Sequence, residues 1–183
     1  MIKLTDQKSD YVLYNLAFPL WFIVWIPGWW WLVLIPINFL IDYTVLGLSI
    51  RKIELAEKSE IKRKSIFRVC LCGFLSDFIG ALFLFGIYMI VTFFGEIFID
   101  LGNRDFGLAL CRWAGNSMSS CWNNVPAFVL TVVSVAVSAL CIFIFNKQLF
   151  INKFGLSEYH AEYIAVRLAV YTAPYLFLIP LIF

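Results

Sequence analysis

The chain has 183 residues, of which 62% are hydrophobic and 14% are charged, and its formal net charge is +2. Soluble domains are about 45–50% apolar and about 25% charged, so this composition excludes an ordinary water-soluble protein. The small net charge, without a strip of alternating aromatic and basic residues, gives no reason to expect nucleic-acid binding. The sequence therefore predicts an all-α, polytopic integral membrane protein that forms a single transmembrane domain.

The first apolar stretch, residues 11–50, carries one formal charge, Asp42. It is long enough for two bilayer crossings of about 20 residues each. A Pro27-Gly28 turn signal lies at its middle among five tryptophans, which favour the membrane interface. We expect a helical hairpin of segments 11–26 and 29–50; the alternative is one crossing with a re-entrant first helix.

A strongly charged linker, residues 51–65, follows the hairpin. Its Glu and Lys residues are spaced i,i+4 in the favourable order, at Glu54 and Lys58 and again at Glu60 and Lys64, which indicates a solvated helix.

Three further apolar segments complete the chain, at about 66–94, 125–145 and 158–183. Residues 95–124 are expected to form an outer loop. Pro126 suits the first turn of a helix, and Ser157 suits an N-cap.

The distribution of basic residues predicts the orientation. With five crossings, eleven Lys and Arg residues lie on the side of the N-terminus and two, Arg104 and Arg112, on the other. Cytoplasmic loops of membrane proteins are enriched in Lys and Arg. We therefore expect a multi-pass protein of the cell membrane with a cytoplasmic N-terminus and an external C-terminus.

Asp77 is the first candidate for a substrate or ion site. It lies nine residues after Arg68, about 13 Å deep by helical rise. A carboxylate at that depth normally faces a protein interior or a wet cavity. Gly73 and Gly80 share its helical face and would let another helix approach closely. The alternative is a buried structural acid without a transport role.

Asp42 lies nine residues before Arg51 and therefore at a similar depth on an oppositely directed segment. Asn38 lies one turn away on the same face. If the two segments pack, two carboxyl groups meet at one level, which suits a proton or cation site. The alternative is that Asp42 reaches interfacial water.

Arg167 is the third charge within an apolar segment and the fourth candidate binding residue, about 7 Å past Glu162. Snorkelling toward the cytoplasmic interface explains it without a function. The alternative is an ion pair with Asp77 or Asp42, or contact with an anion.

Small residues predict where helices pack in lipid. One stripe, in segment 158–183, is Ala161, Ala165, Ala169 and Ala173. A second stripe, in segment 125–145, is Ala127, Thr131, Ser134, Ser138 and Cys141. We expect these two segments to pack together; the alternative is a surface for a partner protein.

Cysteine and histidine usage gives little support to metal chemistry. Cys111 and Cys121 both fall in the expected outer loop and are candidates for a disulfide if that compartment is oxidising; the sequence leaves open whether they are bonded. One histidine and no CxxC pair predict no zinc or iron–sulfur site and no cofactor.

The run Gly73-Phe-Leu-Ser-Asp77-Phe-Ile-Gly80 resembles the glycine-and-aspartate helix of MreD-like rod-shape membrane proteins. The resemblance covers eight residues and implies a membrane scaffold or transport subunit without assigning any residue a role. The chain is also similar in size to the substrate-binding subunits of vitamin transporters.

Two functions fit these patterns. The intramembrane acids and proline-interrupted segments favour a non-enzymatic transport or channel component. The alternative is a membrane scaffold that recruits other membrane or envelope proteins. A membrane-embedded enzyme ranks third, because the sequence contains no motif such as GxSxG or HExxH. In either leading case we expect a homo-oligomer or a membrane-protein partner within the lipid bilayer.

Overall fold

The computed structural model describes residues 29, 31–53 and 58–179, and these are helical with no strand among them. The predicted all-α class is confirmed for this part of the chain, whereas the expected segment 11–26 lies outside the described residues. The α-helices are α2 (Trp31–Arg51), α3 (Lys58–Asp100), α4 (Arg104–Ser119), α5 (Val125–Phe154) and α6 (Glu158–Tyr171), with short 3-10 helices η1 (Cys121–Asn123) and η2 (Tyr175–Leu178).

Two helices are long and apolar enough to cross a membrane, Ser59–Asp100 within α3 and Val125–Phe154, which is α5. Helix α3 has 43 residues and is therefore about 64 Å long. It includes the end of the charged linker, where Lys64 and Glu60 form the expected i,i+4 ion pair. The helix is longer than segment 66–94 because no proline interrupts it before Gly102, which has a φ of +87°.

Helix α5 begins as expected but ends later. Pro126 stands in its first turn, and the Asn124 side chain accepts a hydrogen bond from the Ala127 amide at 2.7 Å. The expected connection at 146–157 is largely helical, because α5 continues to Phe154. It ends at Gly155, whose φ of +61° is a left-handed conformation that glycine adopts readily.

The expected outer loop 95–124 is also largely helical: it holds the end of α3, all of α4 and η1. Helix α4 folds back along α3, and two glycines permit the close approach. A Cβ atom at Gly107 would lie 2.5 Å from the Gly95 carbonyl oxygen. The prediction of a loop was wrong because this contact, rather than local propensity, stabilises the helix.

The last predicted segment, 158–183, is not one helix. The Ser157 side chain caps α6 by accepting from the His160 amide, as expected. The helix ends at Tyr171, and Pro174 precedes η2. Proline disfavours helical backbone at the residue before it, so α6 has 14 residues and is about 21 Å long.

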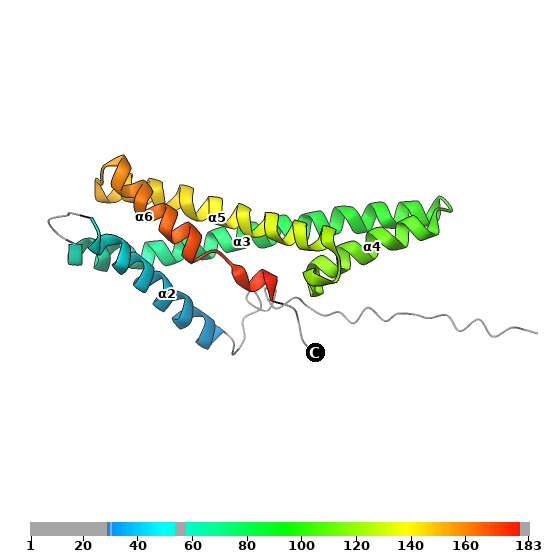
Figure 1. Cartoon of the computed structure of the whole chain (residues 1–183), viewed down its shortest axis with the longest axis horizontal. Coiled ribbons are helices and arrows are strands. Elements are labelled where there is room, and N and C mark those ends of the chain that lie inside the picture. Colours follow the sequence, from blue (N-terminus) through cyan, green and yellow to red (C-terminus); the bar gives the residue numbers. More distant parts are fainter. Residues whose placement is uncertain (1–28, 30, 54–57, 180–183) are drawn as a thin grey trace, which may run out of the picture.

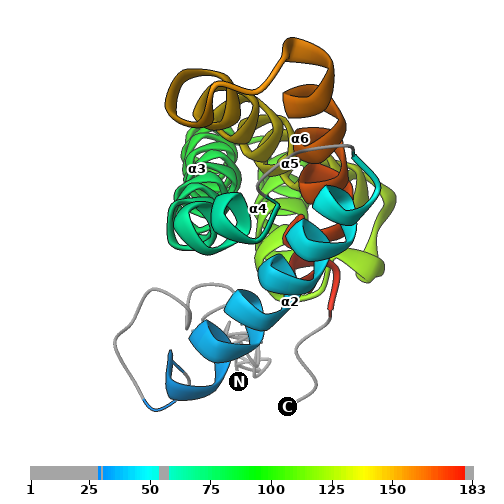
Figure 2. The ribbon, with the colours of Figure 1, turned by 90° about the vertical axis from the view of Figure 1, so that its left-hand side faces the viewer.

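The helices form an elongated bundle around α3 (Figure 1). Helix α5 runs beside α3, while α4 packs on the distal end of α3. Helix α6 packs on α5, and α2 crosses below to contact both α3 and α6, as the end-on view shows (Figure 2). Four helices therefore meet at one end of the bundle. Their shared apolar core includes Leu46, Ile50, Val69, Ile142, Phe150, Ile164 and Leu168.

The small-residue stripe of α5 faces α3. The Ser134 hydroxyl donates to the Gly80 carbonyl oxygen at 2.6 Å, and the Ser138 hydroxyl donates to the Ser76 carbonyl oxygen at 3.2 Å. Helices α5 and α6 do pack together, as expected, but this polar stripe is not their interface. Gly80 therefore permits close contact between α3 and α5.

Candidate functional site: a buried pair of carboxyl groups

Asp42 lies at the junction of α2, α3 and the end of α6. Its side chain is 1% exposed. The Cys70 and Thr172 side chains lie within hydrogen-bonding reach of its carboxylate. Its Oδ2 atom is buried and has no hydrogen-bond partner among the described residues. Asp42 therefore does not reach interfacial water, which was the favoured alternative for this residue.

Asp77 lies on α3, seven residues after Cys70 and thus on a similar face of the helix. Its Oδ1 atom is buried and also lacks a partner in the described part of the chain. The charge of Asp42 acts electrostatically on the Asp77 carboxyl group. The structure thus brings together two carboxyl groups that stand 35 positions apart in the sequence.

Gly73 lies between these acids on α3. A Cβ atom at Gly73 would be 3.6 Å from Asp42 Oδ2, which is ordinary van der Waals contact. A glycine is therefore not required sterically at position 73 beside the Asp42 carboxylate. Asn38 lies one turn before Asp42 on α2 and is half-buried. Gly80 belongs to the α3–α5 contact rather than to the carboxyl pair.

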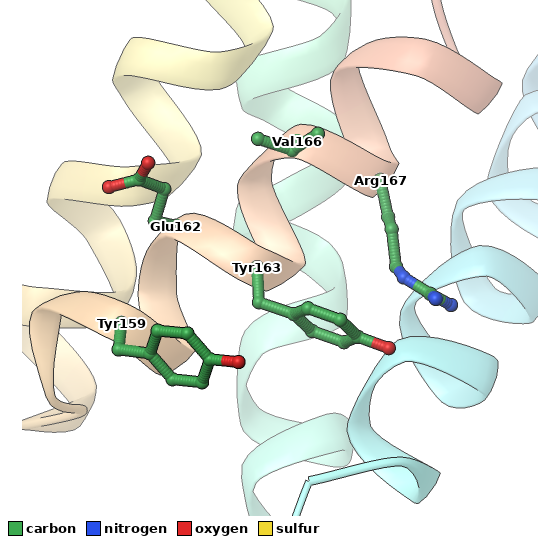
Figure 3. Close-up of a pocket in the computed structure, with 5 residues that line it drawn as sticks. All are labelled: Tyr159, Glu162, Tyr163, Val166 and Arg167. Atoms are coloured by element: carbon green, nitrogen blue, oxygen red, sulfur yellow. The ribbon is translucent and has the colours of Figure 1, made fainter.

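The ion pair of Arg167 with Asp77 or Asp42, which the sequence offered as the alternative to snorkelling, is absent from the described residues. The guanidinium of Arg167 lies over the Tyr163 ring, 4.4 Å from the centroid. The two side chains extend from α6 to the same side, whereas Glu162 points toward α5 (Figure 3). They border a shallow hollow of about 310 Å³, lined also by Tyr159 and Val166. Arg167 thus turns back toward the beginning of α6, as snorkelling requires.

An ion-pair cluster joins α5 to α6. Lys147 Nζ lies 2.9 Å from Glu158 Oε1 and 3.0 Å from Glu162 Oε2. The hydrogen bond from Lys147, together with its charge, holds the pKa of the Glu158 carboxyl below its usual value. Glu158 and Glu162 lie eleven and fifteen positions after Lys147. Because these separations match no helical repeat within one element, the sequence analysis did not identify the cluster.

The alanine stripe is buried inside the protein; Ala161, Ala165 and Ala169 lie on α6, and Ala173 follows its end. Ala161 and Ala165 are 0% exposed, Ala169 is 7% exposed and Ala173 is 8% exposed. These four residues are consequently occupied by packing within the chain and do not present a surface to a partner protein.

Cys111 and Cys121, which the sequence left as a possible disulfide, are free thiols in the structure. Cys111 lies on α4 against Gly95 of α3, whereas Cys121 lies in η1 beside Thr131 of α5. The helix between Cys111 and Ser119 rises about 12 Å, and a disulfide needs Cα atoms about 5.5 Å apart. The cysteines therefore cannot pair without unwinding α4.

Asn146 is a buried polar residue that sequence reasoning missed. It is 0% exposed; its Nδ2 donates to the Ile142 carbonyl oxygen at 2.8 Å, while its Oδ1 has no partner among the described residues. A polar residue after an apolar run was interpreted as the start of a connection. Its position four residues after Ile142, on the buried face of α5, was the signal that could have identified it.

The carboxyl pair can hold a proton or a small cation, because two acidic groups that interact electrostatically are buried and each has an oxygen without a partner among the described residues. No group of three or more His, Cys, Asp or Glu side chains within the described ranges is placed to hold a metal ion.

In comparisons with known proteins, no family model, no curated protein and no solved structure matches the chain. The fold and the site define the class: an all-helical protein with two helices long and apolar enough to cross a membrane and a buried pair of acids beside one of them.

Proposed function

We propose that the protein is a non-enzymatic component of a transport or channel system of the cell membrane, and that Asp42 and Asp77 bind the transported proton or small cation. The observation that carries this proposal is the meeting of these two carboxyl groups with Asp42 Oδ2 and Asp77 Oδ1 unpaired. Burying an unpaired acid is costly, and acids inside membrane proteins commonly mark proton or ion paths.

The helix arrangement supports a path that can open. The pair is held between α2, which contains Pro36, and α3. Proline removes a helical hydrogen bond and permits bending. A small movement of α2 would change both the distance between the carboxyl groups and their access to water. The charge distribution supports a multi-pass topology with the N-terminus in the cytoplasm and the C-terminus outside.

Ion flux into liposomes tests this proposal directly. Purified protein is reconstituted, and proton and monovalent-cation flux is measured for the wild type, Asp42→Asn and Asp77→Asn. We expect flux to fall at least tenfold in both variants. Asp100→Asn is the matched control, because Asp100 lies on the same helix α3 but is exposed, and it should retain flux. Full flux in Asp77→Asn would refute the proposed site.

A second candidate is a membrane scaffold, supported by the basic stretch 51–68. This stretch holds seven Lys and Arg residues, and such stretches attract anionic lipid surfaces. The buried alanines of α6 cannot provide its partner surface. Affinity purification through an N-terminal tag, followed by mass spectrometry, separates the two functions. A transporter subunit in stoichiometric amount supports transport, whereas a wall-building or division protein supports the scaffold.

A further inference from the structure

A groove between the two long apolar helices is separate from the carboxyl pair. It has a volume of about 380 Å³ and lies where α3 and α5 run side by side. Its α3 wall is formed by Leu71, Cys72 and Leu75, and its α5 wall by Phe145, Gln148, Leu149, Asn152 and Lys153.

The groove changes from apolar to polar along its length. On α5 the lining residues pass from Phe145 through Gln148 to Asn152 and Lys153, a rise of about 12 Å. Leu71 and Leu75 face the apolar part from α3. The polar part lies at the end of α5, close to Gly155, where the chain leaves the helix. The groove therefore has one end suited to a hydrocarbon chain and the other to a polar headgroup.

The polar end is positively charged. Lys153 is exposed and makes no salt bridge within the described residues. Arg68 of α3 does not line the groove; it lies over the ring of Phe154, with 5.8 Å between its Cζ atom and the ring centroid. The Gln148 and Asn152 amides can donate hydrogen bonds beside Lys153. One cation with two amide donors suits a phosphate group.

We propose that this groove binds one anionic phospholipid, with the phosphodiester at Lys153 and one acyl chain along Leu71, Leu75 and Phe145. The occupant is a lipid rather than a free anion because the apolar walls continue directly from the charged end. This inference requires α3 and α5 to lie in a membrane, but it does not depend on the carboxyl pair.

Lipid retention by the full-length protein tests the headgroup half of the site. The protein is purified in detergent, mixed with phosphatidylglycerol or with phosphatidylcholine of the same acyl chains, and examined by native mass spectrometry. One cation near a lipid headgroup corresponds to about fivefold in affinity, so we expect about fivefold more bound phosphatidylglycerol. Lys153→Gln should abolish this preference. Arg63→Gln, an exposed cation on α3 that does not line the groove, should preserve it.

A second pair of variants tests the acyl half. Leu75 and Leu82 are each 52% exposed and lie on one face of α3, seven residues apart, but only Leu75 lines the groove. Leu75→Trp should lower retention of both lipids several-fold, and Leu82→Trp should leave it unchanged. Both positions are exposed enough to accept the larger ring without repacking the core.

Each remaining result overturns the proposal. Equal retention of the two lipids by the wild type, or an unchanged preference in Lys153→Gln, would show that Lys153 does not bind the headgroup. If Leu75→Trp retained as much lipid as the wild type, the acyl chain would not lie along Leu75. Displacement of phosphatidylglycerol by inorganic phosphate would show that an anion alone is the ligand. These readouts measure lipid binding and not flux, so they are independent of the proposed transport function.

Discussion

Gly80 of α3 lies directly against Ser138 of α5, and the Ser138 hydroxyl occupies the space that a side-chain methyl group at position 80 would need. The same hydroxyl donates to the Ser76 carbonyl oxygen one turn earlier on α3. This contact sets the separation of the two helices that are long and apolar enough to cross a membrane.

Gly80→Ala should therefore destabilise the protein, whereas Gly73→Ala should not. Alanine gains about 1 kcal/mol over glycine in a helix, but overpacking costs about 1–3 kcal/mol. At Gly80 the Ser134 carbonyl oxygen is 3.1 Å from the new Cβ, while at Gly73 the nearest atom is 3.6 Å away. Thermal denaturation in detergent measures the difference. Equal melting temperatures for the two variants would contradict this close α3–α5 contact.

Gly107→Ala should weaken the packing of α4 on α3. A Cβ atom at Gly107 would lie 2.5 Å from both the Gly95 carbonyl oxygen and Ile99 Cγ1, but one at Gly115 would meet no atom within 4 Å. Gly115→Ala, on the same helix, is thus the matched control and should be neutral or stabilising. Hydrogen exchange of residues 104–119 measures the effect. Unchanged protection in Gly107→Ala would show that α4 is held elsewhere.

Asp42 and Asp77 should show non-additive effects on stability. The two carboxyl groups repel when both are charged, so Asp42→Asn or Asp77→Asn alone removes that repulsion. The double variant cannot remove it twice. Its stability gain should therefore be smaller than the sum of the single gains, by about 0.5–3 kcal/mol. A control cycle with Asp42→Asn and the exposed Asp100→Asn should be additive. If the Asp42→Asn and Asp77→Asn effects were also additive, the two carboxyl groups would not interact.

The Lys147–Glu158 ion pair predicts a dependence of stability on pH. The pKa of Glu158 is lowered in the folded protein from its usual 4.5. The pair therefore stabilises the fold above pH 4.5 and loses this effect as the pH falls through the lowered value. Melting temperatures of wild type and Glu158→Gln should differ slightly at neutral pH, because the pair is exposed, and converge in acid. Glu96→Gln, an exposed acid of α3, serves as the control.

Cys111 and Cys121 should both be alkylated in unfolded protein that has not been reduced, because the structure leaves them as thiols. In folded protein Cys121 should react slowly, since burial raises the pKa of its thiol and keeps it protonated at neutral pH. Mass spectrometry of the labelled peptides measures both the alkylation in unfolded protein and the rate of Cys121 alkylation in folded protein. A peptide pair linked through these two residues would restore the disulfide that the sequence left possible.

Several local features could be read from the sequence because each depends on neighbouring residues. Pro126 and Ser157 marked the beginnings of α5 and α6, since caps and first-turn prolines act within one turn. The prediction that Asp42 and Asp77 lie at similar depths came from counting helical rise from Arg51 and Arg68. That count required only that both segments be helical, and the described part of each is.

The ends of elements were harder to predict than their beginnings. Asn146 was assigned to a connection because it is polar, yet the surrounding helices bury it in α5. Residues 104–119 were expected to belong to a loop because of their polar residues and the Gly-Asn-Ser-Met-Ser-Ser run at 115–120, but Gly107 allows α4 to pack on α3. In both cases a contact with a distant residue outweighs the local preference.

The sequence by itself determined that the chain is helical and apolar enough for a membrane, because composition and periodicity are sums over local residues. Only the tertiary structure decided which polar groups meet. It placed Asp42 beside Cys70 and Gly73, paired Lys147 with α6 rather than solvent, and laid Arg167 over the Tyr163 ring. Such meetings depend on the rotation and crossing of whole helices, which small residues such as Gly80 control through close contact and which no local pattern encodes.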